Sequence, residues 1–394
     1  MRASDCRTAR LSAGMAAVIV SLAIGRAASA QLMIIGNDEK VGFGENMAPI
    51  TREPGHDTVS ILDISQPATP RIVATMPLPN TIVGPPTNLA ITPHQDLALV
   101  ANSLTPGEGG KLVPDDKVYV IDLKANPPAV IGTVTAGKQA SGMAISPDGT
   151  LALVANRADG SISVLSISGK DVKLSDTLSL GTAADNVSAV AFTADGKRAL
   201  AAKFGANRVA LLTVDGNKVT YDKRDLPTGI NTYNIVTTPD GKLAITADTG
   251  GGGSSDGNVD TVSVIDMQAD PVRVIDHITV GDSPEGLAIS PKGDLVVTVE
   301  ARGSNQPSTS WYAHPAGAVT ALRVNGKTVT RVGEVNVGRL PEGAVFSPDG
   351  SYLYVGNFID QDLSVLKVDG DKLTDTGQRF KLPGHPASMR AGPQ

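Results

Sequence analysis

The stretch PEGAVFSPDGSYLYVGNFIDQDLSVLKV, residues 341–368, decides the fold of this chain. Short apolar runs at 344–347, 352–356 and 363–368 alternate with turn residues. Pro348-Asp349-Gly350 is typical of a tight turn, because Pro presets φ and Gly accepts a positive φ. A fourth run follows at 378–382. The pattern predicts a four-stranded antiparallel β-meander.

The same unit recurs along the chain. The turn proline Pro348 has counterparts at five earlier positions, one of them an alanine: Pro93, Pro147, Ala194, Pro239 and Pro291. Their spacings of 45 to 57 residues suit a propeller blade of four strands. A second strand such as LALVANR (151–157) and a third such as ISVLSI (162–167) follow each turn. The chain therefore contains six complete units.

The two ends of the chain supply the seventh unit. Runs at 32–38, 58–64 and 71–78 match second, third and fourth strands, but no first strand precedes them. PASMRAGP (386–393) resembles PEGLAISP (284–291) position by position, so we expect it to form the inner strand of the first blade. That pairing would close the ring and remove its edges. Residues 31–394 are thus predicted to form one all-β domain, a seven-bladed β-propeller with 52 residues per blade.

These residues resemble a known family. LALVAN, YLYVGN, the SPDG turns and the VSVID strands are similar to YVTN-type β-propeller repeats. The resemblance covers all of 31–394 and implies an exported, lactonase-like seven-bladed propeller. It is specific for the fold and not for an activity, because the matching residues are strand core and turns.

The N-terminus reads as a secretory signal peptide spanning residues 1–30. Three arginines precede the apolar run 11–24, and Ala28-Ser29-Ala30 is a cleavage-type sequence. The run is too short for a spanning helix, so we expect a periplasmic or secreted protein with no stable membrane insertion after cleavage. An uncleaved N-terminal anchor is the alternative.

Removal of the leader changes the composition in two ways. Cys6, the only cysteine, is lost, which excludes disulfides, thiolate metal sites and a cysteine nucleophile. Four Arg and one Asp also leave, so 30 basic and 39 acidic residues remain, a net charge of −9. An acidic balance argues against nucleic acid or an anionic membrane as partner.

The long insertions all lie between second and third strands, at 39–57, 103–116, 249–260 and 301–317. In a propeller these loops share one face, here called the top face, while the turns between first and second strands are uniformly tight. Loops on a rigid scaffold commonly carry function, so we expect a small molecule or a protein to bind at the top face. Neutral drift of exposed loops is the alternative.

Alignment of the blades predicts which residues surround the top mouth of the channel. Six residues before each turn the ring reads Thr87, Ser141, Ser188, Tyr233, Glu285, Glu342 and Ala387. The ends of the second strands read Asn37, Asn102, Asn156, Lys203, Asp248, Glu300 and Asn357. Asn is the default at this second position and is expected to cap the loop. His385 and Arg390 enter from the closing strand.

Close carboxylates raise each other's pKa, so one of them could act as a general base. The catalytic candidates are Glu285, Glu342, His385 and Arg390, and the ligand-binding candidates are Lys203, Tyr233, Asp248, Glu300, Trp311 and Tyr312. The sequence indicates no specific cofactor, but Ca²⁺ could bind the oxygen ligands of Asn156, Asp248, Glu285 and Glu300. The third interpretation is a hydrated acidic rim without chemistry.

Histidine and aromatic residues leave further alternatives open. His56, His314 and His385 fall in top-face segments and would suit a transition metal if they met. Trp311 and Tyr312 form an aromatic pair on a long exposed loop, where they would serve as a binding lid or pack on their own blade.

Two functions follow from these observations. The first is a non-catalytic exported propeller that binds a small molecule or protein through its top face. The second is a lactonase- or cycloisomerase-like enzyme that uses carboxylates at the channel mouth. The lack of an obligatory catalytic motif favours the first, and the family resemblance implies the second.

Overall fold

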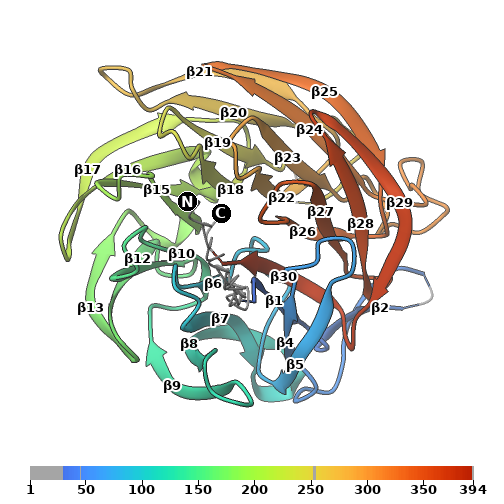
Figure 1. The fold of residues 1–394 in the computed structure, drawn as a ribbon, viewed down its shortest axis with the longest axis horizontal. Coiled ribbons are helices and arrows are strands. Elements are labelled where there is room, and N and C mark those ends of the chain that lie inside the picture. Colours follow the sequence, from blue (N-terminus) through green and yellow to red (C-terminus); the bar gives the residue numbers. More distant parts are fainter. Residues whose placement is uncertain (1–29, 45, 252–253, 393–394) are drawn as a thin grey trace, which may run out of the picture.

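The computed structural model describes residues 30–44, 46–251 and 254–392, so nearly all of the predicted leader, 1–30, lies outside the described residues. The described chain forms seven four-stranded antiparallel sheets arranged around a central axis, as Figure 1 shows. The predicted seven-bladed, all-β propeller is therefore confirmed. In the part of the chain that the structure describes, no helix has the length and apolar character needed to cross a membrane.

The first blade contains strands from both ends of the chain. It pairs β30 (Pro386–Ala391), β1 (Leu32–Asn37), β4 (Thr58–Asp63) and β5 (Arg71–Pro77) in that order. β30 runs antiparallel to β1, with Ile34 opposite Arg390 and Ile35 opposite Met389. Figure 1 shows the red C-terminal strand beside the blue N-terminal one. The predicted closure of the ring by the tail is confirmed.

The other six blades follow the chain without crossover. Blades two to four contain β6 (Leu89–Ile91), β7 (Leu97–Pro106), β8 (Leu112–Asp122) and β9 (Ala129–Thr135); β10 (Ala140–Ile145), β11 (Leu151–Asn156), β12 (Ser161–Ser168) and β13 (Asp171–Ser179); and β14 (Val187–Phe192), β15 (Arg198–Lys203), β16 (Arg208–Asp215) and β17 (Lys218–Pro227).

Blades five to seven contain β18 (Thr232–Thr237), β19 (Leu243–Asp248), β20 (Thr261–Asp266) and β21 (Arg273–Thr279); β22 (Pro284–Ile289), β23 (Leu295–Glu300), β24 (Ala318–Asn325) and β25 (Thr328–Asn336); and β26 (Pro341–Phe346), β27 (Tyr352–Asn357), β28 (Asp362–Asp369) and β29 (Lys372–Lys381). The top insertion of blade one adds the hairpin β2 (Val41–Phe43) and β3 (Pro49–Thr51). Three short 3₁₀ turns complete the described elements: η1 (Glu108–Gly110), η2 (Ala183–Asp185) and η3 (Phe204–Ala206).

The hydrophobic core lies between neighbouring blades. Inner-strand and middle-strand residues of one blade pack on those of the next, because each sheet has two apolar faces and both must be covered. The seam between blades seven and one is packed in the same way: Met33, Ile35, Leu62 and Met389 of blade one meet Tyr354 and Val365 of blade seven. The closing blade is therefore joined by apolar burial as well as by its strand ladder.

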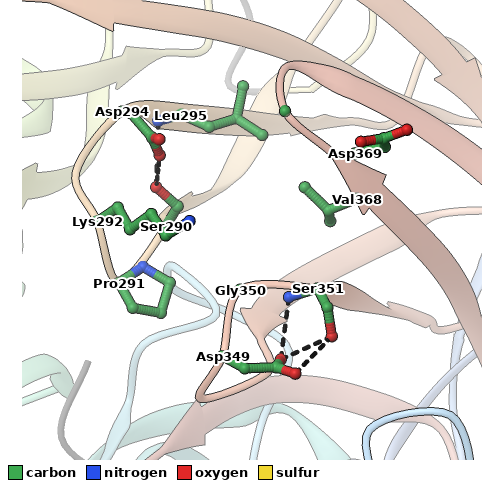
Figure 2. A pocket seen from close by; sticks show the side chains of 11 residues that line it. Ser290, Pro291, Lys292, Asp294, Leu295, Asp349, Gly350, Ser351, Val368 and Asp369 are labelled. Atoms are coloured by element: carbon green, nitrogen blue, oxygen red, sulfur yellow. Dashed lines mark hydrogen bonds between the residues drawn. The ribbon is translucent and has the colours of Figure 1, made fainter.

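In blades three, four, five and seven the turns between first and second strands share one side-chain contact. Ser347 Oγ donates to Asp349 Oδ1 at 2.6 Å, and Ser146 donates to Asp148 at 2.5 Å in blade three. In blade six Lys292 replaces the turn aspartate, and Ser290 Oγ donates instead to Asp294 at 2.7 Å. Figure 2 shows two of these turns, from blades six and seven, around a crevice of about 190 Å³. Ser290 pairs with Asp294 and Ser351 with Asp349, while the exposed Asp369 has no dashed contact in Figure 2, so most polar groups of this crevice belong to the structure of the turns.

Candidate functional site

Six of the seven residues of the predicted ring are the second residue of an inner strand, Thr87 lies just before β6, and none of the seven is paired in the strand ladder. In β18 the pairing passes from Thr232 to Asn234 and skips Tyr233. In β22 it passes from Pro284 to Gly286 and skips Glu285, and in β26 it skips Glu342 together with Gly343. A bulge re-aims the side chain of the extra residue. The repeat thus leaves the predicted ring residue of each blade without a ladder partner.

Glu285 and Glu342 occupy equivalent places on neighbouring strands and interact electrostatically. The backbones approach closely, since a Cβ atom on Gly286 would lie 2.0 Å from the carbonyl oxygen of Glu342. Only glycine at 286 allows this approach. Burial raises the pKa of Glu285 to about 7. Burial and the charge of Glu285 raise the pKa of Glu342 well above its ordinary value. Because the charge of Glu285 raises the pKa of Glu342, Glu285 is the member of the pair that ionises first.

Tyr233 lies at the same level and forms the polar end of the site. Its hydroxyl oxygen accepts the Gly84 N–H at 3.1 Å and also a hydrogen bond from Arg157. Burial raises the pKa of Tyr233, so its proton stays on the oxygen. Among the described residues no acceptor is found for that proton. Tyr233 consequently offers a hydrogen bond to whatever occupies the channel.

Arg157 is a site residue that the sequence reasoning missed. Its guanidinium carbon lies 5.5 Å from the ring centre of Tyr233 and 5.7 Å from that of Phe204, while Nε donates to Asn186 Oδ1 at 2.7 Å. Its charge also lowers the pKa of Glu285 in opposition to burial. Arg157 directly follows the second-strand Asn156, and the other blades carry no cation at that position: Asp38, Ser103, Phe204, Thr249, Ala301 and Phe358. Aligning one residue further would have found it.

A long link, residues 78–88 between β5 and β6, crosses the top of the channel; we call it the crossing link. It has eleven residues, whereas the other six links into first strands have four or seven. Ile82 packs against a cluster that contains Leu340 and Phe358 of blade seven, and Gly84 reaches Tyr233 of blade five. At Gly84 φ is +123°, and a Cβ atom there would lie 2.4 Å from Ser141 Oγ. The channel is therefore closed on the top face, which the sequence reasoning did not anticipate.

A buried ionic network holds the crossing link in place. Lys40 Nζ donates to Asp57 Oδ2 at 2.6 Å and to the carbonyl oxygen of Asn80. Asp38 lies 3.4 Å from Lys40 and accepts the Ile82 N–H at 2.8 Å. The side chains of Lys40 and Asp38 are 3% and 0% exposed. Burial raises the pKa of Asp38, and the charge of Lys40 opposes that rise.

Beneath the link, several polar groups of the ring lack partners. Among the described residues Thr87 Oγ1, Ser141 Oγ and Glu342 Oε2 are buried without a hydrogen bond. A buried polar atom without a partner is unfavourable unless a ligand or solvent completes it. Three such atoms at one level, together with the free Tyr233 donor, mark the upper channel as the candidate site.

Three predicted ligand-binding residues at the ends of second strands direct their side chains away from the channel, toward their own blades. Lys203 forms ion pairs of 2.9 Å with Asp185 and Asp225 in its own blade. Burial lowers the pKa of Lys203, but the two carboxylates together raise it by more, so the net shift is upward. Asp248 accepts the hydroxyls of Thr232, Thr246, Thr261 and Ser263, and Glu300 accepts that of Thr298 at 2.7 Å.

Asp248 and Glu300 contact the link that precedes their blade, as Asn156 does in blade three. Asn156 Oδ1 accepts the N–H of Gly137 in the preceding link at 3.2 Å, and Asp248 and Glu300 contact Gly229 and Gly281 at the equivalent place. The expected capping role of Asn thus extends to the acidic replacements. The four calcium candidates Asn156, Asp248, Glu285 and Glu300 are not brought together. Within the described chain, no three His, Cys, Asp or Glu residues are grouped so as to hold a metal ion.

The two catalytic candidates from the closing strand, His385 and Arg390, lie in different parts of the structure. His385 Nδ1 lies 3.1 Å from Glu39 Oε1, its Nε2 lies 2.8 Å from Gln361 Nε2, and its ring lies 5.1 Å from that of Phe358. Burial lowers the pKa of His385, so the imidazole is held neutral. Arg390 lines the lower channel instead of the top mouth. Neither residue contacts Glu285 or Glu342 in the described structure.

Trp311 and Tyr312 lie on the top rim, away from the ring. Their rings meet edge to face at 5.2 Å, and Trp311 is 80% exposed. Together with His314 and Arg302 they line a hollow of about 320 Å³ that also involves Gly257 of the neighbouring insertion. The pair packs partly on that insertion. It does not cover the carboxyl pair, as a lid over the channel mouth would have to do.

Comparison with known proteins supports the fold. Residues 120–228 match the family model described as "Lactonase, 7-bladed beta-propeller". That segment includes Arg157 but not the carboxyl pair. The chain resembles the lactonase propellers. A curated relative, Antigen Lp49 of Leptospira interrogans, is 31% identical over 111 residues, which is 28% of this chain and only 23% of the antigen.

Solved structures extend the likeness to nearly the whole chain. A putative 6-phosphogluconolactonase from Bacteroides uniformis has a TM-score of 0.70 at 16% identity, covering 92% of this chain and 99% of that one. The periplasmic gluconolactonase PpgL of Pseudomonas aeruginosa has a TM-score of 0.67 at 18% identity, covering 93% and 99%. At such identities the likeness shows the fold alone.

Proposed function

We propose that this protein is an exported enzyme that hydrolyses a small lactone in the upper channel. The observation that carries the proposal is the pair Glu285 and Glu342, adjacent, enclosed and unequal in protonation. One carboxyl that is ionised near pH 7 and one that keeps its proton supply a base and an acid at the same place. The lactonase match of residues 120–228 supports the reaction class.

The chemistry assigns one role to each group. Glu285 takes a proton from a water molecule, whose oxygen then bonds to the lactone carbonyl carbon. Tyr233 donates its hydrogen bond to the carbonyl oxygen as negative charge develops there, and Arg157 holds Tyr233 in position. When the ring C–O bond breaks, Glu342 protonates the leaving alkoxide. The product is an open-chain hydroxy acid, which loses its carboxylic proton to solvent; its carboxylate is then repelled by Glu342, now an anion, and this favours release. The proton held by Glu285 returns to Glu342 and resets the pair.

The charges of the site favour an unphosphorylated substrate. A phosphate dianion beside Glu285 would be repelled, and Arg157 already donates to Asn186 and Tyr233. Thr87 and Ser141 have free hydroxyl oxygens that suit sugar hydroxyls. We therefore propose an uncharged sugar lactone. The leader at 1–30 supports export to the periplasm or the medium, where the protein is expected to have no nucleic-acid partner.

The test is hydrolysis of D-gluconolactone, followed by proton release after subtraction of the spontaneous rate. We expect Glu285→Gln to lower kcat by about 10²–10⁴, and wild-type kcat/KM to rise with pH through about 7 as Glu285 ionises. Glu300→Gln is the matched control, because Glu300 is a buried carboxyl of the same blade outside the ring. Equal rates for Glu285→Gln and wild type would overturn the mechanism. Binding of the lactone without turnover would favour the non-catalytic alternative.

A further inference from the structure

The lower half of the channel holds a second cavity, separate from the ring. It has a volume of about 460 Å³ and is lined by inner strands of six blades and the turns that follow four of them. Its walls are largely apolar, with Met143, Ile145, Val190, Phe192, Ile235 and Ile289 among the lining residues. Arg390 is the only charged residue in the lining, and no carboxylate lies there.

Arg390 breaks the repeat at its position. Three residues before each turn the other six blades carry a small apolar residue: Ala90, Ala144, Ala191, Val236, Ala288 and Val345. A long cation in this place cannot be explained by blade packing, since alanine or valine fills the site six times. The ladder of β1 and β30 fixes the backbone of Arg390 opposite Ile34. The side chain therefore stays within the channel.

The guanidinium of Arg390 has no protein partner among the described residues. No hydrogen bond or ion pair involves its side chain, whereas Arg157, Arg302, Arg323 and Arg379 all have acceptors. Its surroundings lower the pKa of Arg390 to about 10 through desolvation alone, without an opposing carboxylate. Arg390 is half-buried, and a charge that is partly withdrawn from solvent is unfavourable unless it is paired and hydrogen-bonded. An anion entering the cavity would supply both.

The lining also limits what that anion can be. A single planar guanidinium matches one carboxylate in a two-pronged hydrogen bond, and no second cation stands beside it to hold a phosphate dianion. The apolar walls suit a hydrocarbon tail, because burying each methylene contributes about 0.8 kcal/mol. The ligand thus needs one negative charge and an apolar body.

We propose that the lower channel is a binding site for an amphipathic monocarboxylate, held by Arg390 at its head and by the apolar walls at its tail. The site is independent of the lactone chemistry proposed above. It opens among the tight turns, on the face opposite the long insertions, so the two sites take their ligands from different regions of the channel.

The test is calorimetric titration of the mature protein with hexanoate. We expect hexanoate to bind at least tenfold more tightly than acetate, which lacks the tail, and than hexanamide, which lacks the charge. Arg390→Met should weaken hexanoate binding at least tenfold, and Arg390→Lys should weaken it less. Arg323→Met is the matched control, because Arg323 is exposed and pairs with Asp371, and it should bind hexanoate as the wild type does.

Folding of each variant is checked by its melting temperature. A second readout uses the wild type alone: the Arg390 Nε–H resonance should shift on addition of hexanoate and not on addition of hexanamide. Equal binding of hexanoate by Arg390→Met and wild type would overturn the proposal. So would equal binding of hexanamide and hexanoate, or a wild-type Arg390 resonance that millimolar hexanoate does not move.

Discussion

Replacing Lys40 with methionine tests whether the buried network holds the crossing link over the channel. The change removes the cation that Asp38 and Asp57 share and leaves the Asn80 carbonyl oxygen without its donor. Breaking a buried pair in this way costs about 3–5 kcal/mol of unfolding free energy, because a charge stays behind without a partner. That is a large part of the roughly 5–15 kcal/mol of a typical domain.

The loss should depend on pH. Burial raises the pKa of Asp38 even in the presence of Lys40, and removal of the cation can only raise it further. A carboxyl whose folded-state pKa lies above its unfolded value destabilises the fold at neutral pH, and the penalty disappears as pH falls toward the unfolded value of about 4. The difference between Lys40→Met and wild type should therefore be smaller at pH 5 than at pH 7.5.

The assay is urea unfolding at both pH values, followed by circular dichroism. Lys173→Met is the matched control, because Lys173 and Asp171 form an ion pair whose side chains are 70% and 57% exposed. Exposed pairs contribute at most about 1 kcal/mol. If Lys40→Met costs no more than Lys173→Met, or if its deficit does not change with pH, the network is not the anchor described here.

Two further predictions concern the ring and its closure. Deletion of residues 386–394 leaves β1 without its partner β30 and exposes Met33 and Ile35, so we expect a lower melting temperature and association of molecules in size-exclusion chromatography. Removal of 393–394 alone is the control, and an unchanged, monomeric 386–394 deletion would contradict closure by the tail. Glu342→Gln removes a carboxyl whose folded-state pKa is raised, which lowers stability as pH increases, so the variant should gain stability relative to wild type between pH 5 and pH 8. Identical pH slopes in urea unfolding of the two proteins would show that Glu342 is not enclosed as described.

Sequence periodicity was sufficient to predict the fold because a propeller repeats its core residues and turns. The turn residues located every blade, and the likeness of 386–393 to 284–291 located the closing strand. The same register placed Glu285, Glu342 and Tyr233 at one level, since the residue six before each turn falls at the ladder bulge in these blades.

Side-chain direction was not predictable in the same way. Lys203, Asp248 and Glu300 share an alignment column, but that column faces the preceding link and not the channel. The residue after it, Arg157, does reach the channel. The closed top depends on contacts between Gly84 and Tyr233, 149 residues apart, which no local pattern encodes. In the sequence, only the length of the crossing link indicates that the top of the channel is closed.

The most direct test of the central claim is the titration of Glu285 itself, followed through its side-chain carboxyl carbon by nuclear magnetic resonance. An enclosed pair predicts a midpoint near pH 7 for Glu285, with Glu342 ionising only after it. A midpoint near the ordinary value of about 4.3 would mean that both carboxylates face solvent, and the acid–base site in the upper channel would have to be abandoned.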